Sequence, residues 1–440
     1  MSKDSLLRTF GLLCGLCVLA LAAALGAQTL TAPKYKFDPD WPKTLPNKWK
    51  MGGVTGLAVD KDDNVWVYDR PNDLRDIELD AEINGTDCCA RPPSMIHIDK
   101  DGNVINYFDP PQGHGMAVDS KGFVYLGNSV HGIGNVRKYD PKTGKLLAEL
   151  PHSPETENGG AGGGGGGGAD EAPAARVPGH GGQGPVQTAP PAGAAGRAGR
   201  AADPAAQAAR AKAVAAFRAK YPPTTPMIVG GIEEVRLDEP AHELYAADNY
   251  LGGRVMVFDL DTFAFKRGWG AYGHKLSEIT TDDKDRDYVP NGPMPKEFRN
   301  HLTLNISNDG LVYAADRGAN RIDVTTKEGK FVKEFILAPS TAVPPPPDHP
   351  LPNTGKEGSA GGVGFSVDPR QRFLFISDLS NNHVWFLNRE DGKVVGTLGS
   401  MGQNGGQFFG LHMIAVDSKG DIYTGEVFNG ERVQRFVPVK

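Results

Sequence analysis

The chain has 440 residues, of which 39% are hydrophobic and 23% are charged, and its formal net charge is -6. This composition is ordinary for a soluble globular protein, and it excludes nucleic acid as a partner because no basic field is present. The length does not require several domains, since all-β propellers often use as many residues for one.

The first 27 residues predict a secretory signal peptide. Basic residues precede an apolar run from Phe10 to Leu25, and small residues follow it. The alternative is an anchoring helix, but the run is shorter than the roughly 20 residues that cross a bilayer. We therefore expect a mature chain, residues 28–440, that is periplasmic or secreted and has no membrane span.

Two of the four cysteines, Cys14 and Cys17, lie within the predicted signal peptide. The other two, Cys88 and Cys89, are adjacent in sequence, which excludes an ordinary framework of disulfides that close long loops. In an oxidising compartment they can form a vicinal disulfide, and two reduced thiols are the alternative.

Six copies of one sequence unit recur along the chain. Each copy contains an apolar run, an Asp, a turn with Gly, a second apolar run and a polar turn with Arg or His. The copies begin at Gly56, His114, Ile232, His301, Val363 and His412. Because one four-stranded blade cannot bury both of its faces, six copies predict a single all-β domain, a six-bladed β-propeller.

The two ends of the chain are predicted to share the last blade. The sixth copy ends after its third strand, and an unassigned extended segment, Lys34 to Trp41, follows the predicted signal peptide. We expect this segment to supply the missing strand and close the ring, because closure removes exposed sheet edges.

Two stretches fall outside the repeat. Residues 155–226, between blades two and three, are rich in Gly, Ala and Pro and predict a mostly disordered insertion. Within it, Ala205 to Lys220 contains strong helix formers and is a candidate helix. The insertion is either a lid or a passive spacer, and its composition favours the spacer. Pro339 to Gly362 is predicted to be a loop between blades four and five.

Three histidines occupy matching places on alternate blades. His114 and His412 each stand five residues before the Asp of the repeat, and His301 opens the corresponding strand of blade four. Because innermost strands line the channel and alternate blades of a six-fold ring lie about 120° apart, the three imidazoles can converge. Three protein ligands with an open fourth position are typical of catalytic zinc.

The alternative is that these histidines coincide by chance, since the chain contains 11. His301 also lies one residue further from its hairpin than the other two, and a one-residue slip reverses a strand side chain. His301 must therefore precede its strand or lie beside a bulge. The other blades carry Thr55, Glu233 and Val363 at or near this place.

Three further side chains are predicted at the same rim, because antiparallel pairing places the start of a first strand beside the end of the second. They are Arg70, Tyr250 and Arg317. A guanidinium can hold a carboxylate through two parallel hydrogen bonds, and a phenol near zinc and arginine loses its proton more easily. The alternatives are rim ion pairs for the arginines and a turn aromatic for Tyr250.

This pattern resembles the peptidyl-α-hydroxyglycine α-amidating lyases, a family of six-bladed propellers related to NHL repeats. The resemblance covers most of the chain outside the insertions. It implies a zinc ion on three histidine ligands, which here are His114, His301 and His412. It also implies a catalytic Tyr, an active-site Arg and a rim Arg, which match Tyr250 in DNYLGGRVMVFD, Arg70 in VYDR and Arg317 in ADRGANRI.

The chain also departs from this family. Met413 stands where the family has an Asp that helps to hold a structural calcium, so calcium is doubtful. Tyr313 and Leu251 stand where the family has disulfide cysteines. Segments such as NNHVWFL and GERVQRF also occur in propellers that only bind partners, so the fold does not by itself imply catalysis.

The residues and the resemblance together predict a zinc-dependent lyase that cleaves the C–N bond of a carbinolamide, such as a C-terminal α-hydroxyglycine, and releases an amide and glyoxylate. Tyr250 is the expected base, and Arg70 stabilises its phenolate or the substrate carboxylate. The alternative is a non-catalytic propeller that binds a peptide, a glycan or an envelope protein. A lactone-cleaving propeller would need acidic calcium ligands in the channel, which we do not find. We expect a monomer with a small-molecule or peptide substrate.

Overall fold

The computed structural model describes residues 30–74, 76–128, 134–153, 204–249, 251–299, 301–341, 358–427 and 430–439. The predicted signal peptide, most of the predicted insertion and Tyr250 lie outside these ranges. Two compact units are separated at Pro33, and the second, from Lys34 onward, contains all the sheets. No helix within the described ranges is both long and apolar enough to cross a membrane.

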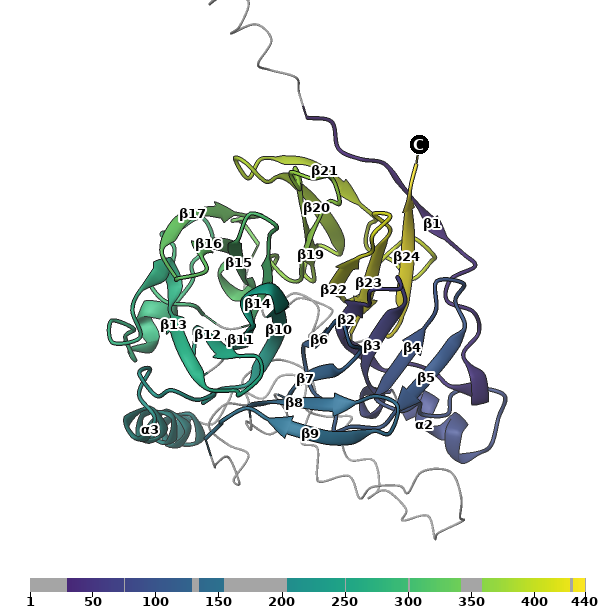
Figure 1. Cartoon of the computed structure of the whole chain (residues 1–440), viewed down its shortest axis with the longest axis horizontal. Coiled ribbons are helices and arrows are strands. Elements are labelled where there is room, and N and C mark those ends of the chain that lie inside the picture. Colours follow the sequence, from purple (N-terminus) through teal and green to yellow (C-terminus); the bar gives the residue numbers. More distant parts are fainter. Residues whose placement is uncertain are drawn as a thin grey trace, which may run out of the picture. The chain divides into compact units, whose positions relative to one another are not determined.

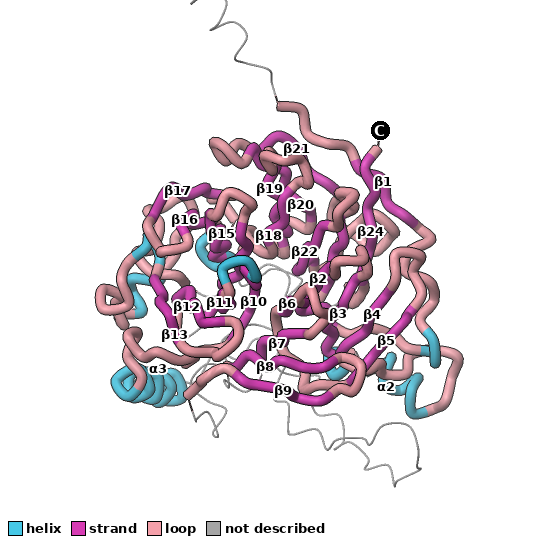
Figure 2. The backbone as a smooth tube through the Cα atoms, viewed as in Figure 1, coloured by secondary structure: helices cyan, strands magenta, loops and turns pink. Residues whose placement is uncertain are grey.

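The second unit is a six-bladed β-propeller, as the repeats predict, with six four-stranded antiparallel sheets arranged in a ring (Figure 1). In the tube drawing of Figure 2, strands account for far more of the chain than helices do. The first three blades are β2 (Gly53–Val59), β3 (Val65–Arg70), β4 (Met95–Ile98) and β5 (Val104–Phe108); β6 (Met116–Val118), β7 (Val124–Asn128), β8 (Asn135–Asp140) and β9 (Lys145–Glu149); and β10 (Ile232–Asp238), β11 (Glu243–Asp248), β12 (Arg254–Asp259) and β13 (Phe265–Trp269).

The remaining blades follow in chain order, and the last one contains both ends of the propeller. They are β14 (Leu302–Ile306), β15 (Leu311–Asp316), β16 (Arg321–Thr326) and β17 (Phe331–Ile336); β18 (Val363–Phe365), β19 (Phe373–Asp378), β20 (His383–Asn388) and β21 (Val394–Leu398); and β22 (Leu411–Val416), β23 (Ile422–Glu426), β24 (Val433–Pro438) and β1 (Tyr35–Asp38). The hydrophobic core lies between neighbouring blades; Val54 and Val67 of blade one, for example, pack with Tyr423 of blade six.

The Asp of the repeat organises the hairpin between the first two strands of a blade. The Oδ1 atom of Asp119 accepts hydrogen bonds from the amides of Lys121 and Phe123, at 3.0 and 2.8 Å. Asp417 accepts two amides in the same way, both at 2.9 Å. A carboxylate that accepts hydrogen bonds from the amides two and four residues ahead fixes a tight turn. This explains why the Asp recurs at the same place before the second strand in these repeats.

The polar turn of the repeat supplies a buried ion pair at the end of the second strand. The carboxylate and guanidinium lie 2.9 Å apart in the pair Asp248 and Arg254, and in the pair Asp316 and Arg321. All four side chains are fully buried, so removing one partner would leave an uncompensated charge in the interior. These pairs lock the second and third strands of blades three and four together.

The N-terminal strand closes the ring, as predicted from the extended segment. β1 pairs antiparallel with β24, with Tyr35 opposite Pro438 and Asp38 opposite Arg435. The two strands lie side by side in Figure 1. The Arg435 Nε atom also donates to the Asp38 carboxylate at 2.9 Å. The outer edge of β24 is thereby covered.

The last part of the predicted insertion contains a helix. Helix α3 (Pro204–Lys220) matches the candidate helix, and its Arg218 guanidinium donates to Asp283 at 2.6 Å. The segment after the helix is held by the buried Arg254, which donates to the carbonyls of Thr225 and Met227 at 3.0 and 2.7 Å. The composition of this segment did not reveal that its backbone oxygens satisfy a buried cation.

Removal of β1 tests the closure of the ring. A chain that begins at Pro39 is expected to unfold at lower urea concentration than one that begins at Lys34, and to self-associate, because the edge of β24 becomes exposed. Urea titration followed by tryptophan fluorescence and size-exclusion chromatography measure the two effects. Equal midpoints and equal elution volumes for both chains would contradict a closing role for β1.

Two deletions test the boundary of the insertion. Replacing residues 158–203 with a short Gly-Ser linker is expected to shift the melting temperature by only a few degrees, because closure entropy changes by about 0.6 kcal/mol per doubling of loop length. Extending the deletion to residue 226 also removes carbonyl partners of Arg254 and is expected to cost about 1–3 kcal/mol more, because a buried donor is left unsatisfied. Calorimetry that finds the same melting temperature for both deletions would show that these contacts do not stabilise the fold.

Candidate metal centre

The three predicted histidines lie at irregular points of three innermost strands. His301 directly precedes β14 and has a positive φ of 60°, which is the irregularity that its spacing requires. His412 is the residue at which the register between β22 and β23 shifts, between Leu411 and Met413. His114 precedes β6 and is followed by Gly115, whose φ is 74°. Irregularities of this kind re-aim a side chain relative to the strand.

Blades one and three have an irregularity at the same place. The register of β2 with β3 shifts between Val54 and Gly56, and that of β10 with β11 shifts between Ile232 and Val235. The residues in these shifts include Thr55 and Glu233, both almost fully buried. The start of the innermost strand therefore carries a register shift in blades one, three and six and a residue with positive φ in blades two and four.

His114 and His412 are in direct contact although 298 positions separate them in the sequence. Their Nε2 atoms lie 3.3 Å apart, and both side chains are buried. Two imidazole nitrogens bound to one tetrahedral zinc at about 2.0–2.1 Å would lie about 3.3–3.4 Å from each other. The separation in the structure thus fits two ligands of a shared ion.

Both of these histidines are neutral at neutral pH. Burial lowers the pKa of His114 to about 4, and the guanidinium groups of Arg70 and Arg317 act in the same direction against the opposing carboxylate of Glu233. Burial, the neighbouring His114 and the same two arginines hold the pKa of His412 well below its usual range. Neutral imidazole is the form that binds metal ions, so no proton has to leave.

The Glu233 carbonyl determines which nitrogen of His114 faces His412. The His114 Nδ1 atom lies 2.8 Å from the backbone oxygen of Glu233. A carbonyl oxygen only accepts hydrogen bonds, so Nδ1 carries the proton and Nε2 presents its lone pair. The His412 Nδ1 atom is buried and makes no hydrogen bond to any described residue.

His301 is tied to the same glutamate through the side chain. Its Nδ1 atom lies 2.7 Å from Oε1 of Glu233. Burial alone would raise the pKa of this carboxyl group, but His301, His114 and Arg317 outweigh burial and hold the pKa well below its usual range. The carboxylate therefore accepts a hydrogen bond from Nδ1 of His301, and Nε2 is the ring nitrogen that this contact leaves for a metal ion. In the sequence, Glu233 stood out only as the residue that blade three carries at or near the place where blades two, four and six carry a histidine.

The described residues include no group of three His, Cys, Asp or Glu side chains already placed to hold one metal ion. The structure joins His114 to His412 directly, and it joins both His114 and His301 to Glu233. A shared ion on all three histidines stays a prediction. The donor set fits zinc in chemistry, because all three side chains are imidazoles and Nδ1 of both His114 and His301 is engaged with Glu233, which leaves Nε2 as the ligand nitrogen.

Arg70 and Arg317 lie at the same rim as the histidines. Arg317 begins the short helix η7 (Arg317–Ala319), is buried, and donates its backbone amide to the His301 carbonyl at 3.3 Å. Arg70 ends β3 and is partly exposed. It forms an ion pair with Asp73 at 2.7 Å, which is the alternative role that the sequence left open for it. Both arginines act electrostatically on His114 and His412. Tyr250 lies outside the described residues.

Cys88 and Cys89 are joined in a vicinal disulfide, one of the two states that the sequence left open. They follow helix α2 (Asp76–Ile83) in the long loop after β3. The Cys89 amide donates to the Lys48 carbonyl at 3.3 Å, and its φ is 102°. The disulfide thus belongs to a loop anchored on the segment before blade one.

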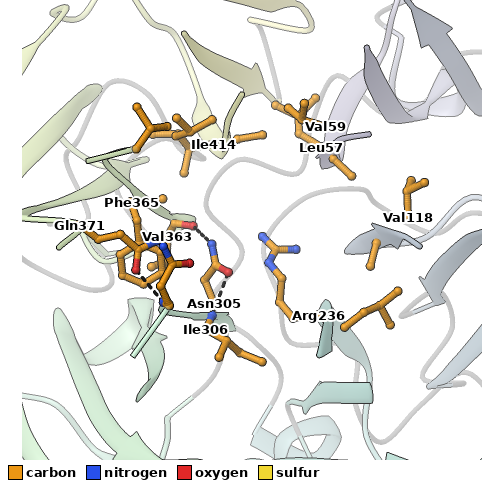
Figure 3. A pocket seen from close by; sticks show the side chains of 18 of the residues that line it. Leu57, Val59, Val118, Arg236, Asn305, Ile306, Val363, Phe365, Gln371 and Ile414 are labelled. Carbon is orange, nitrogen blue, oxygen red and sulfur yellow. Dashed lines mark hydrogen bonds between the residues drawn. The ribbon is translucent and has the colours of Figure 1, made fainter. Parts of the chain in front are cut away.

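A cavity of about 540 Å³ lies among the later residues of the innermost strands, away from the strand starts that carry the histidines. Its lining combines apolar side chains such as Leu57, Val363 and Ile414 with polar ones, and the Arg236 guanidinium extends into it (Figure 3). Arg236 donates to Glu234 at 2.7 Å. Burial raises the pKa of Glu234 to about 7 despite this ion pair. The channel therefore contains a charged side chain, Arg236 in its ion pair with Glu234, apart from the histidines.

Comparison with known proteins adds no functional assignment. The sequence matches no protein-family model and no curated protein. Solved structures that are similar to the chain include a structural genomics protein of unknown function from Bacteroides thetaiotaomicron, at 14% identity and a TM-score of 0.49, covering 93% of this chain and 73% of that one. Hydrazine synthase of Kuenenia stuttgartiensis is 12% identical with a TM-score of 0.41, covering 87% and 76%. Virginiamycin B lyase from Staphylococcus aureus is 10% identical with a TM-score of 0.40, covering 92% and 89%.

Loss of one imidazole tests the metal centre. The protein is expected to bind about one zinc ion per chain. Changing a residue that only supports a ligand typically weakens metal binding by roughly 10- to 100-fold. His412→Gln removes a ligand itself, so it is expected to weaken zinc binding by more than this. Competition with a fluorescent chelator measures the affinity. His242→Gln is the matched control, because His242 is exposed and pairs with Asp261 at 2.9 Å. Unchanged affinity in His412→Gln would exclude His412 as a ligand.

Proposed function

We propose that the protein is an exported zinc-dependent lyase that cleaves the C–N bond of a carbinolamide, such as a C-terminal α-hydroxyglycine, and releases an amide and glyoxylate. The contact between the neutral imidazoles of His114 and His412 carries this proposal, because their Nε2 separation of 3.3 Å suits two ligands of one zinc ion. The resemblance to the α-amidating lyases supplies the reaction class, and the predicted signal peptide supplies the location.

The three histidines would hold the ion, and zinc when bound supplies a Lewis acid that makes a hydroxyl proton easier to remove. Arg70 and Arg317 contribute positive charge at the same rim. A guanidinium in this place recognises the carboxylate of an α-hydroxyglycine and orients the scissile bond. Because Arg70 also pairs with Asp73, a substrate carboxylate would have to compete with that ion pair.

Tyr250 is the proposed base, on the strength of the resemblance. It removes the proton from the substrate hydroxyl. The electron pair of that O–H bond becomes the carbonyl bond of glyoxylate, the C–N bond breaks, and the departing nitrogen takes a proton to give the amide. Positive charge from Arg70 favours the phenolate form of this base.

A non-catalytic propeller that binds a peptide, a glycan or an envelope protein is the second candidate. One observation favours it: among the described residues no three metal-binding side chains are already placed to share an ion. In that case the contact of His114 with His412 would be a hydrogen bond between two neutral rings. Stoichiometric zinc in the purified protein distinguishes the two candidates.

Release of glyoxylate tests the proposed function. Zinc-loaded protein is expected to convert α-hydroxyhippurate to benzamide and glyoxylate, and Tyr250→Phe is expected to lower kcat by about 100-fold or more, because general base catalysis contributes about 100- to 10,000-fold. Arg70→Gln is expected to raise KM. Arg372→Gln is the control, since Arg372 is exposed and forms its ion pair with Asp368 across a turn. Full zinc occupancy without glyoxylate release would contradict the proposal.

A further inference from the structure

We infer that Glu233 is the positioning residue of the metal centre, and that it holds His114 and His301 in the tautomer that presents Nε2 to a divalent cation. This inference rests on the proposed zinc site but not on the proposed reaction. It assigns a role to blade three, which contributes no histidine to the centre.

Glu233 uses two chemically different groups for the two histidines. Its backbone oxygen accepts from Nδ1 of His114 at 2.8 Å, and its carboxylate accepts from Nδ1 of His301 at 2.7 Å. Blade three lies between blades two and four in the ring, so one residue reaches both neighbours. In both histidines it is Nδ1 that contacts Glu233, so Nε2 is the ring nitrogen left to face a cation.

The backbone irregularity in β10 makes this double contact possible. Residues opposite each other pair regularly from Val235 onward, but the register shifts between Ile232 and Val235, and Glu233 lies within the shift. A regular strand would alternate side chains between its two faces and keep its carbonyls in the ladder. The irregular start frees one carbonyl for His114 and turns the carboxylate toward His301.

Burial strengthens the carboxylate contact. Glu233 is only 1% exposed, and in such surroundings a hydrogen bond to an ionised group is stronger than in water. A carboxylate behind a metal-binding histidine fixes the ring orientation and raises the basicity of the ligand nitrogen. His301 needs this fixation, because it lies outside its strand with a positive φ of 60°.

The neighbouring Glu234 provides a matched control. It is equally buried at 1% exposure, but its carboxylate accepts from Arg236 at 2.7 Å rather than from a histidine. The variants Glu233→Gln and Glu234→Gln therefore replace the same buried group, one position apart in the same strand. Only Glu233→Gln alters a group bonded to the proposed ligands.

The experiment measures the zinc affinity of the full-length mature protein by competition with a fluorescent chelator, and the unfolding midpoint of each metal-free variant. Glu233→Gln is expected to bind zinc about 10- to 100-fold more weakly, whereas Glu234→Gln stays within a few-fold of the unsubstituted protein. Glu233→Asp keeps the carboxylate and is expected to recover part of the lost affinity.

Equal zinc affinity in Glu233→Gln and the unsubstituted protein would overturn the inference. The same loss in both Gln variants would also overturn it, since general damage to the channel would then explain the effect. If Glu233→Gln does not fold, the comparison of Glu233→Asp with Glu234→Asp decides in the same way. Zinc binding without glyoxylate release would contradict the proposed function alone, and absence of zinc binding in the unsubstituted protein would contradict both.

Discussion

The antiparallel pairing of β1 with β24 is the constraint on which the rest of this structure depends. Each blade buries its faces only against its neighbours, so the core is complete only when the last blade contacts the first. Closure also brings the starts of the six innermost strands to one rim. His114 and His412, which are 298 positions apart in the sequence, contact each other for this reason.

Polar side chains enter the channel where the repeat is irregular, and several of them are paired across blades. The Thr55 hydroxyl donates to the Gly113 carbonyl at 2.7 Å, and Glu233 accepts from two histidines. Buried polar groups without partners are costly, so irregular backbone is retained where side chains of neighbouring blades can satisfy one another. The regular parts of the blades pack against one another and stabilise the ring, whereas the irregular strand starts carry the buried polar side chains of the candidate site.

Much of the fold was predictable because the repeat determines it. The Asp of each hairpin turn, the polar turn with Arg and the extended N-terminal segment all have the expected roles. The register argument also correctly required an irregularity at His301. The role of Glu233 was not predictable, because a β-bulge depends on contacts between blades that no local pattern shows. The helix in residues 204–220 was predicted from its composition, but its anchoring was not, because Arg254 from blade three binds carbonyls of the segment that follows the helix.

The charges around the candidate centre bear on the ligand that would complete it. Arg70 is balanced by Asp73, and Arg317 lies beside the ionised Glu233, while His114 and His412 are neutral. A divalent cation on the histidines would add two positive charges to this buried site. Such a site favours an anion in the open coordination position, because burying uncompensated charge is costly. An α-hydroxy carboxylate supplies one negative charge at once and a second when its hydroxyl loses a proton. An uncharged alcohol or amide supplies neither charge on binding. Under the proposed function, the electrostatics of the rim therefore select for the carboxylate of the substrate as well as for its hydroxyl group.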